Sequence, residues 1–177
     1  MGRPKALIPI EGTTLLERTV QTARCITEDI LLIGEPAFAV PATVSTVPIL
    51  RDLHAGIGPV GGLETMLSEL VGQSCLLLAC DMPKLSEALL RRIASAAGDF
   101  DAAVCRTAGR RHPCCGLYRP SVLPYLQSAV EAGRFSMMTL LDELRIMAID
   151  LTGEDARAVE NWNEPSDIRP PLNSKDT

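Results

Sequence analysis

The ten residues SCLLLACDMP, positions 74–83, decide how this chain folds. The continuous apolar run is typical of a short strand that is buried on both faces, as in a parallel sheet covered by helices. The run stops at Asp81, and Pro83 stiffens the turn that follows. Because ligands of open α/β sheets bind beyond the carboxyl ends of the strands, Asp81 is predicted to face a ligand site. A carboxylate there suits Mg²⁺, although an Asp that only caps a turn would give the same pattern.

Strand-like and helix-like segments alternate on both sides of this run. Helical spacing or capping signals predict helices at residues 11–26, 58–72, 86–98, 119–133 and 136–145. Apolar or β-branched runs predict strands at 29–34, 42–50 and 145–151, and a hairpin around Gly109 joins 100–107 to 112–120. This alternation indicates a single α/β domain with a mainly parallel sheet, to which the hairpin adds an antiparallel strand.

Composition narrows the function classes. The chain has 177 residues, a formal net charge of −5 and only 3% aromatic residues. The negative charge argues against a nucleic-acid partner, and few aromatic rings are available to stack on bases. The sequence contains neither an apolar run of the roughly 18 residues that span a bilayer nor the apolar stretch of a secretory signal. We therefore expect a cytoplasmic protein without a membrane partner, whose six cysteines are reduced.

Other polar residues stand at points where a ligand could bind. Arg3 and Lys5 precede the first predicted helix, and both side chains suit phosphate oxygens. Asp52 follows a predicted strand and precedes a glycine-rich loop that leads into a helix. Asn161 and Asn163 follow the last predicted strand. Each has an ordinary alternative: solvated terminal charges, a flexible loop, or an Asx turn.

In this order, the segments resemble the molybdenum cofactor guanylyltransferases. The resemblance is carried by RPKALIPIEGTTLLE (3–17), Asp52 with GPVGGL (58–63), LLACDMP (77–83), HPCCGLYRP (112–120) and NWNEPSD (161–167). It implies a Rossmann-like three-layer nucleotidyltransferase fold over one domain, residues 1–168. The charged segment 169–177 is expected to be a disordered tail.

The resemblance also implies a reaction. Family members transfer GMP from GTP to molybdopterin with the help of Mg²⁺ and release pyrophosphate; a molybdoenzyme or a cofactor-delivery protein is a possible partner. By matching motifs, Lys5 and Asp81 would be catalytic and Asp81 would hold the metal. The nucleotide would be bound by Arg3, Lys5, Asp52 and Asp81, and the pterin side would be lined by Asn161 and Asn163. Since the acceptor phosphate is largely dianionic near neutral pH, the reaction needs no general base.

The resemblance departs from the family at its beginning. Family members open with a strand and a glycine-rich loop, whereas Met1 and Gly2 match a point late in that motif. We therefore expect the first strand of the sheet to be missing from this sequence. Two alternatives remain: a molybdopterin cytidylyltransferase or other nucleotidyltransferase, and a truncated, inactive protein that binds nucleotide or pterin. Basic residues around the hairpin could bind the pterin phosphate: Arg106, Arg110, Arg111 and Arg119.

Overall fold

The apolar run that decides the fold forms strand β5, Cys75–Leu78, in a computed structural model that describes residues 4–162 of the chain. β5 is an edge of a four-stranded sheet of order β5-β7-β6-β8, with β6 at Ala102–Thr107, β7 at Arg110–Tyr118 and β8 at Ile146–Asp150. β7 runs antiparallel to β5 and β6, and β8 runs parallel to β6. The sheet is therefore mixed rather than mainly parallel, because the predicted hairpin inserts its second strand between β5 and β6.

Two smaller pairs of strands lie apart from this sheet. β3 (Leu32–Ile33) pairs in parallel with β4 (Ile49–Leu50), and β1 (Pro9–Ile10) pairs antiparallel with β2 (Thr13–Thr14). Among residues 4–162 no strand joins β3 to β5, so the two sheets are separate.

The strand predicted at residues 42–50 is wrong over most of its length. Ala42–Val44 form a short 3-10 turn, η2, that begins after Pro41. The Thr43 hydroxyl in this turn donates a hydrogen bond to the Glu17 carboxylate on the first helix. Only the last two residues, after Pro48, pair as β4. A tertiary contact and flanking prolines thus override the β-branched composition of the segment.

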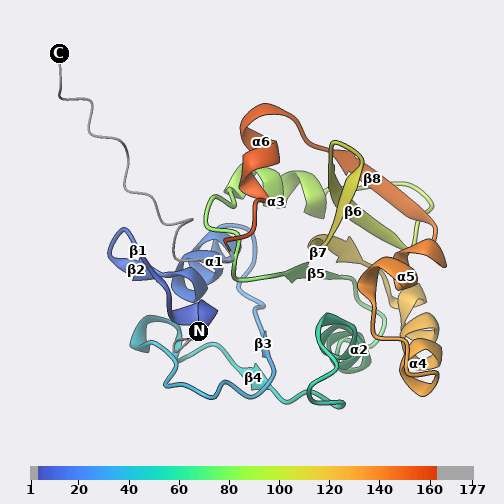
Figure 1. The fold of residues 1–177 in the computed structure, drawn as a ribbon, viewed down its shortest axis with the longest axis horizontal. Coiled ribbons are helices and arrows are strands. Elements are labelled where there is room, and N and C mark those ends of the chain that lie inside the picture. Colours follow the sequence, from blue (N-terminus) through green and yellow to red (C-terminus); the bar gives the residue numbers. More distant parts are fainter. Residues whose placement is uncertain (1–3, 163–177) are drawn as a thin grey trace.

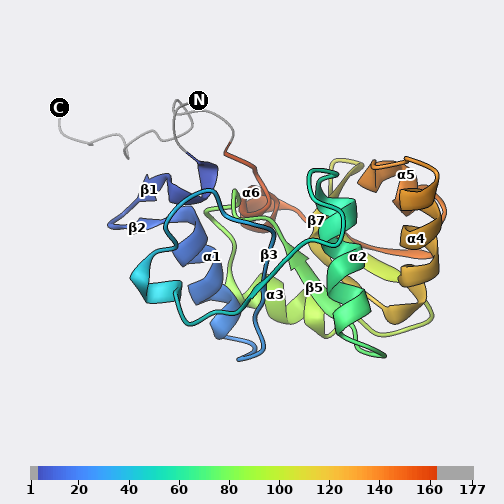
Figure 2. The same cartoon turned by 90° about the horizontal axis from the view of Figure 1, so that it is seen from below.

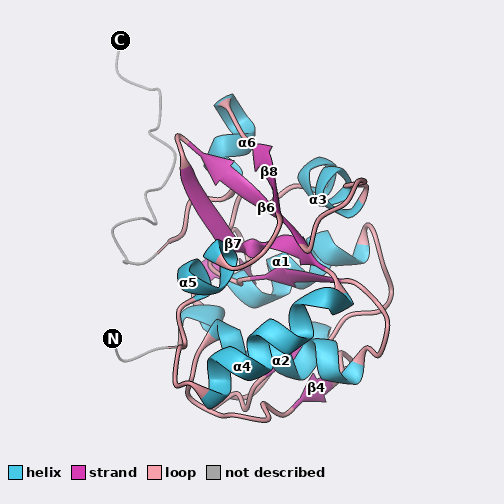
Figure 3. Ribbon diagram, turned by 90° about the vertical axis from the view of Figure 1, so that its right-hand side faces the viewer, coloured by secondary structure: helices cyan, strands magenta, loops and turns pink. Residues whose placement is uncertain are grey.

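Helices cover both faces of the four-stranded sheet, which gives the predicted three layers (Figures 1 and 3). The layer on one face contains α1 (Leu15–Arg24), α3 (Glu87–Ala94) and α6 (Gly153–Ala158). The layer on the other face contains α2 (Pro59–Glu69), α4 (Leu123–Glu131) and α5 (Met137–Asp142). Helix α6 was not predicted, because GEDARA has too few apolar residues for a helical pattern.

Alternating side chains of the central strand β6 divide the core between these layers. Ala103 and Cys105 pack on the α3 side, whereas Ala102 and Val104 pack on the α2 side, and all four are fully buried. The first helix begins at Leu15, four residues later than predicted, because β1 and β2 pair within residues 9–14. The Thr14 side chain accepts from the Glu17 amide, and the Glu17 carboxylate accepts from the Thr14 amide. This capping box fixes the start of α1 next to the 3-10 turn η1, Lys5–Leu7. η1 and α1 lie at one end of the molecule, and α4 and α5 lie at the other (Figure 2).

Candidate active site

The structure brings together two residues that the sequence places far apart. Asp81 lies just beyond the carboxyl end of β5, and Lys5 lies in η1. Lys5 Nζ is 4.0 Å from Asp81 Oδ2. The Asp81 side chain is largely buried, with 17% of its surface exposed, whereas 40% of the Lys5 side chain is exposed. The pair therefore has one buried anionic partner and one cationic partner that reaches solvent.

The Asp81 carboxylate is incompletely satisfied. Its Oδ1 atom is buried and has no hydrogen-bond partner among the described residues. Burial raises the pKa of Asp81, and the Lys5 charge and a backbone hydrogen bond offset part of that rise. Burial also raises the pKa of the Cys114 thiol to about 11, and the nearby Asp81 charge adds to this shift. A buried oxygen without a donor is costly in free energy, so this site favours a cation or a hydrogen-bond donor.

The last described residues of the chain lie beside the loop that carries Asp81. The Trp162 amide donates a hydrogen bond of 2.9 Å to the backbone carbonyl of Asp81, and Figure 1 shows the segment after α6 running back to the loop that follows β5. Asn161, the residue before Trp162, is exposed. The predicted Asn161 is thus the neighbour in sequence of a residue whose amide binds the backbone of Asp81. Two other predicted residues, Arg3 and Asn163, and the predicted tail 169–177 lie outside the described residues.

Asp52, which follows β4, is a second carboxylate that lacks a hydrogen-bond donor among the described residues. Its Oδ1 atom is buried without a hydrogen-bond partner in the described part of the chain, and burial raises the pKa of this carboxyl. A Cβ atom built on Gly34 or on Gly62 would lie 3.8 Å from an Asp52 oxygen. Asp52 therefore sits between the end of β3 and the first turn of α2. Helix α2 begins at Pro59, and its N-cap residue, Gly58, offers no side-chain cap.

A third carboxylate with a buried, unsatisfied oxygen, Glu64 on α2, was not predicted from the sequence. Its side chain is 7% exposed, and its Oε2 atom has no hydrogen-bond partner within residues 4–162, although His54 Nε2 lies 3.5 Å away. A signal was present: Glu64 shares a helix face with Val60 and Leu67, which are both in the core. An acidic residue on the apolar face of a helix is predicted to be buried.

The four arginines considered for the pterin phosphate do not form one cluster. Arg106 makes two hydrogen bonds to the Asp150 carboxylate, of 2.6 and 2.8 Å, and Arg111 is 2.6 Å from Asp142. Arg119 lies at the other end of β7, with its guanidinium 3.8 Å from the centre of the Phe100 ring. Arg106, Arg110 and Arg111 lie near the hairpin tip, since Arg106 pairs with Arg111 across the two strands. The charges of Arg106, Arg111 and Arg119 are thus engaged within the protein.

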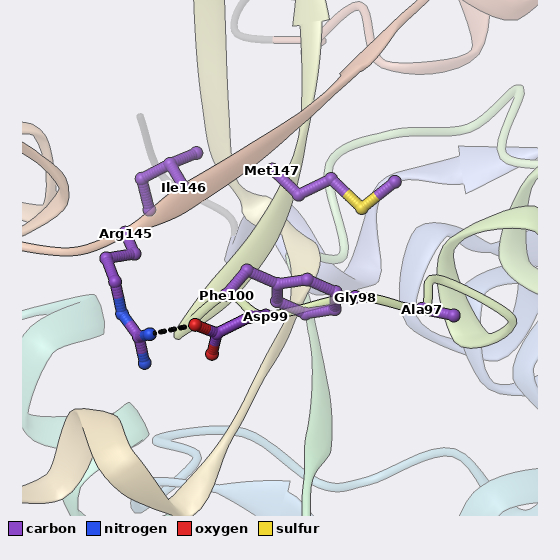
Figure 4. A pocket seen from close by; sticks show the side chains of 7 residues that line it. All are labelled: Ala97, Gly98, Asp99, Phe100, Arg145, Ile146 and Met147. Atoms are coloured by element: carbon purple, nitrogen blue, oxygen red, sulfur yellow. Dashed lines mark hydrogen bonds and ion pairs between the residues drawn. The ribbon is translucent and has the colours of Figure 1, made fainter.

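A hollow of about 360 Å³ lies far from this site, at the amino ends of β6 and β8. Figure 4 shows Phe100 and Met147 on its wall and the Arg145 guanidinium directed toward Asp99. The distance between Arg145 Nη1 and Asp99 Oδ2 is 2.6 Å. Because Arg145 also binds Asp101, its charge belongs to a network that holds the sheet together.

A metal ion is one cation that could balance the negative charge of the Asp81 carboxylate. Among residues 4–162 no three His, Cys, Asp or Glu side chains gather so that they could hold a metal ion by themselves. Magnesium at nucleotide sites is often held by one or two carboxylates together with substrate phosphates. The unsatisfied Oδ1 of Asp81 fits that kind of site, since it offers a buried anionic oxygen to which no described protein group donates. In the same part of the chain, no helix is long and apolar enough to cross a membrane.

Comparisons with known proteins agree with the resemblance seen in the sequence. The profile of the family described as "MobA-like NTP transferase domain" matches residues 1–146. The chain is 28% identical over 153 residues to a protein from Carboxydothermus hydrogenoformans named "probable molybdenum cofactor guanylyltransferase". That match covers 85% of this chain and 75% of the relative.

Solved structures support the same fold. Molybdopterin-guanine dinucleotide biosynthesis protein A from Archaeoglobus fulgidus superimposes with a TM-score of 0.76 at 19% identity, covering 94% of this chain and 87% of that one. The 2-C-methyl-D-erythritol 4-phosphate cytidylyltransferase from Thermus thermophilus gives a TM-score of 0.70 at 18% identity, with coverages of 93% and 90%. At these identities the likeness establishes the nucleotidyltransferase fold. The two solved structures share this fold although one name refers to a guanine nucleotide and the other to a cytidylyl group.

Proposed function

The chain belongs to the MobA-like NTP transferase domain family and is a nucleotidyltransferase, and from this premise we propose that it transfers GMP from GTP to molybdopterin. The products are the guanine dinucleotide form of the cofactor and pyrophosphate. The relatives named molybdenum cofactor guanylyltransferase support this choice of substrates.

One observation carries the proposal: Asp81 Oδ1 is buried without a donor among the described residues, while Oδ2 lies 4.0 Å from Lys5 Nζ. A carboxylate that served only the fold would have its donors supplied by the protein, as buried polar groups generally do. Its place beyond the carboxyl end of β5 is where α/β sheets bind ligands. Asp81 is therefore assigned to a bound cation, and Lys5 to the phosphates beside it.

In the proposed reaction, an oxygen of the molybdopterin phosphate forms a bond to the α-phosphorus of GTP. The bond from that phosphorus to the bridging oxygen breaks, and pyrophosphate leaves with the electron pair. Mg²⁺ held by Asp81 would neutralise phosphate charge and orient the phosphates. The Lys5 ammonium adds a positive charge on a flexible stem, which suits a phosphate group whose charge shifts during transfer.

The other predicted residues complete the two sides of the site. We assign Asp52 to the nucleotide, because its unsatisfied oxygen can accept a hydrogen bond from a ribose or base donor. Arg3 belongs to the same side by its position two residues before Lys5. Asn161 is assigned to the pterin side because it adjoins Trp162, whose amide binds the Asp81 carbonyl, and Asn163 is assigned to that side by the family resemblance alone. Asparagine offers both a donor and an acceptor to a pterin ring.

The proposal is tested by supplying the chain with molybdopterin, Mg²⁺ and GTP labelled at the α-phosphate. The expected result is label in the pterin product and release of one pyrophosphate per label transferred. Parallel reactions contain CTP in place of GTP, or a sugar phosphate in place of molybdopterin.

Each outcome distinguishes the alternatives. Faster transfer from CTP would replace the proposal with a cytidylyltransferase, and transfer to the sugar phosphate would replace the acceptor. Binding of GTP and molybdopterin without transfer would identify a binding protein instead of an enzyme.

A further inference from the structure

The segment HPCCGLY, residues 112–118 of β7, has no part in the function proposed above. None of its side chains was assigned to nucleotide, metal or pterin. It nevertheless interrupts the regular pairing of the sheet next to the strand that leads to Asp81. This irregularity has a definite geometry, which the pairing of β7 with its two neighbours reveals.

Strand β7 keeps different registers with β6 and with β5. Along β6, Val104 pairs with Gly116, but the next residue, Cys105, pairs with His112. The β7 residues 113–115 therefore have no partner in β6. Along β5 the pairing continues without a break, since Leu78 pairs with Cys115. The bulge thus interrupts the pairing of β7 with β6 but keeps its pairing with β5.

The bulge lengthens the pairing of β5 toward Asp81. The Ala79 amide donates a hydrogen bond of 2.9 Å to the carbonyl of Cys114, which lies inside the bulge. Only Cys80 then separates this bond from Asp81, whose own carbonyl accepts from the Trp162 amide at 2.9 Å. Two hydrogen bonds therefore fix the backbone around Asp81: one is made by the Ala79 amide, two residues earlier, and the other by the carbonyl of Asp81 itself.

Buried contacts within β7 hold the bulge in shape. The Tyr118 hydroxyl donates a hydrogen bond of 2.7 Å to the carbonyl of Pro113, and the Tyr118 residue is fully buried. At Gly116, the residue that follows the bulge, a Cβ atom would lie 2.8 Å from the Ala103 carbonyl oxygen. Glycine is therefore required for β7 to approach β6 this closely. At the other end of the bulge, His112 Nε2 and Thr107 Oγ1 are 2.7 Å apart.

We propose that Tyr118 is a positioning residue: through the bulge at 113–115 it holds the end of β5 so that the Asp81 carboxylate is placed for a divalent cation. The inference rests on the proposed role of Asp81. Bulges are designed features that re-aim a side chain near a functional site, and a displaced ligand weakens metal binding. Tyr118 itself touches neither substrate nor metal in this assignment.

The test compares Tyr118→Phe with a matched control, Ser121→Ala. Each removes one hydroxyl donor from a 2.7 Å hydrogen bond, to the Pro113 carbonyl in the first case and to the Asp101 carboxylate in the second. Ser121 contacts the amino end of β6, away from Asp81. Hydrogen exchange of the Ala79 amide reports the end of β5 directly, and Mn²⁺ binding followed by electron paramagnetic resonance in the presence of GTP reports the cation site.

In Tyr118→Phe we expect the Ala79 amide to exchange about five- to tenfold faster than in Ser121→Ala, and Mn²⁺ to bind more weakly by a similar factor. Equal Ala79 exchange and equal Mn²⁺ affinity in the two variants would overturn the inference. Asp81→Asn separates the two proposals. If it leaves Mn²⁺ affinity unchanged, the cation role of Asp81 fails; if it abolishes binding while Tyr118→Phe behaves like the control, only the positioning role fails. Should Tyr118→Phe not fold, Pro113→Gly, which loosens the same bulge, replaces it in these measurements.

Discussion

Asp81 and Asp101 are both largely buried carboxylates at the margins of the same sheet, yet their surroundings are opposite. β5 and β6 run in the same direction, since both are antiparallel to β7. Asp81 therefore lies beyond the carboxyl ends of these strands, and Asp101 lies at their amino ends. Asp101 accepts four hydrogen bonds: three from Arg145, at 2.9, 3.0 and 3.1 Å, and one from the Ser121 hydroxyl at 2.7 Å. Asp81 Oδ1 accepts none from the described residues.

The pKa values follow the same division. Hydrogen bonds from Arg145 hold the pKa of Asp101 well below its usual range, whereas burial raises the pKa of Asp81. The fold supplies every donor that Asp101 needs, so this charge stabilises the protein. At Asp81 no described residue donates to Oδ1, and in the proposed function a bound cation balances this charge. The comparison contrasts a carboxylate whose donors all come from the protein with one that we propose to serve the site.

The largest expected effect is on catalysis at Asp81. Asp81→Asn should lower the rate of GMP transfer by about a hundredfold to a thousandfold, because the neutral amide cannot hold the cation. The free energy of unfolding should stay the same or rise, since burial disfavours the charge that is removed. Steady-state kinetics and urea denaturation check both parts. Transfer at the wild-type rate would end the assignment of Asp81 to the site.

The second expected effect is on stability at Asp101. Asp101→Asn should lower the free energy of unfolding by about 2–3 kcal/mol, because it replaces charge-assisted hydrogen bonds in a buried position. Asp99→Asn is the control: Asp99 also binds Arg145, but its side chain is 83% exposed, so little stability should be lost. Urea denaturation measures all three proteins. GTP affinity of folded Asp101→Asn should equal that of the wild type, and a large loss would mean that the two ends of the sheet are coupled.

The third effect is the pH dependence of that stability. The pKa of Asp101 is lower in the folded protein than in the unfolded chain, where it is about 3.9. Its contribution is therefore fully present above about pH 4 and is lost as the pH falls toward the folded pKa. The stability difference between the wild type and Asp101→Asn should be larger at pH 7 than at pH 3. Urea titrations at both values measure it, and an equal difference at both would show that the Asp101 charge is not the cause.

The smallest effect is expected at the partner of Asp81. Lys5→Ala should weaken GTP binding by about tenfold and should change molybdopterin binding less, because Lys5 is assigned to the triphosphate. Lys84→Ala removes the same charge nearby, from a Lys that pairs with Glu160 at 3.4 Å, and serves as the control. Calorimetry with each ligand gives the affinities. The same loss of GTP affinity in both variants would indicate a general effect of charge instead of a contact.

Local patterns in the sequence were sufficient for several elements and named the candidate site residues, whose roles stay predictions. Glu17 in the first turn and a threonine before it predict a cap at Thr13 or Thr14, and the structure has the cap at Thr14. The apolar run that stops at Asp81 predicts a strand and the end at which a ligand binds. The hairpin of β6 and β7 follows from two strand-like runs and the turn at Gly109 between them. These features depend on neighbours in the chain.

What only the tertiary structure decided depends on partners that are distant in sequence. The order of the strands, with β7 between β5 and β6, makes the sheet mixed. Whether a carboxylate is satisfied depends on which hydrogen-bond donors the fold brings to it. Arg145, 44 residues away in sequence, donates to Asp101. Lys5 Nζ stays 4.0 Å from Asp81 Oδ2, and Glu64 is buried near His54. Local spacing in the sequence does not predict these long-range contacts, because they form when apolar faces of distant elements pack against one another. The sequence therefore identified the candidate residue Asp81, and the three-dimensional arrangement decided that its charge remains open to a ligand.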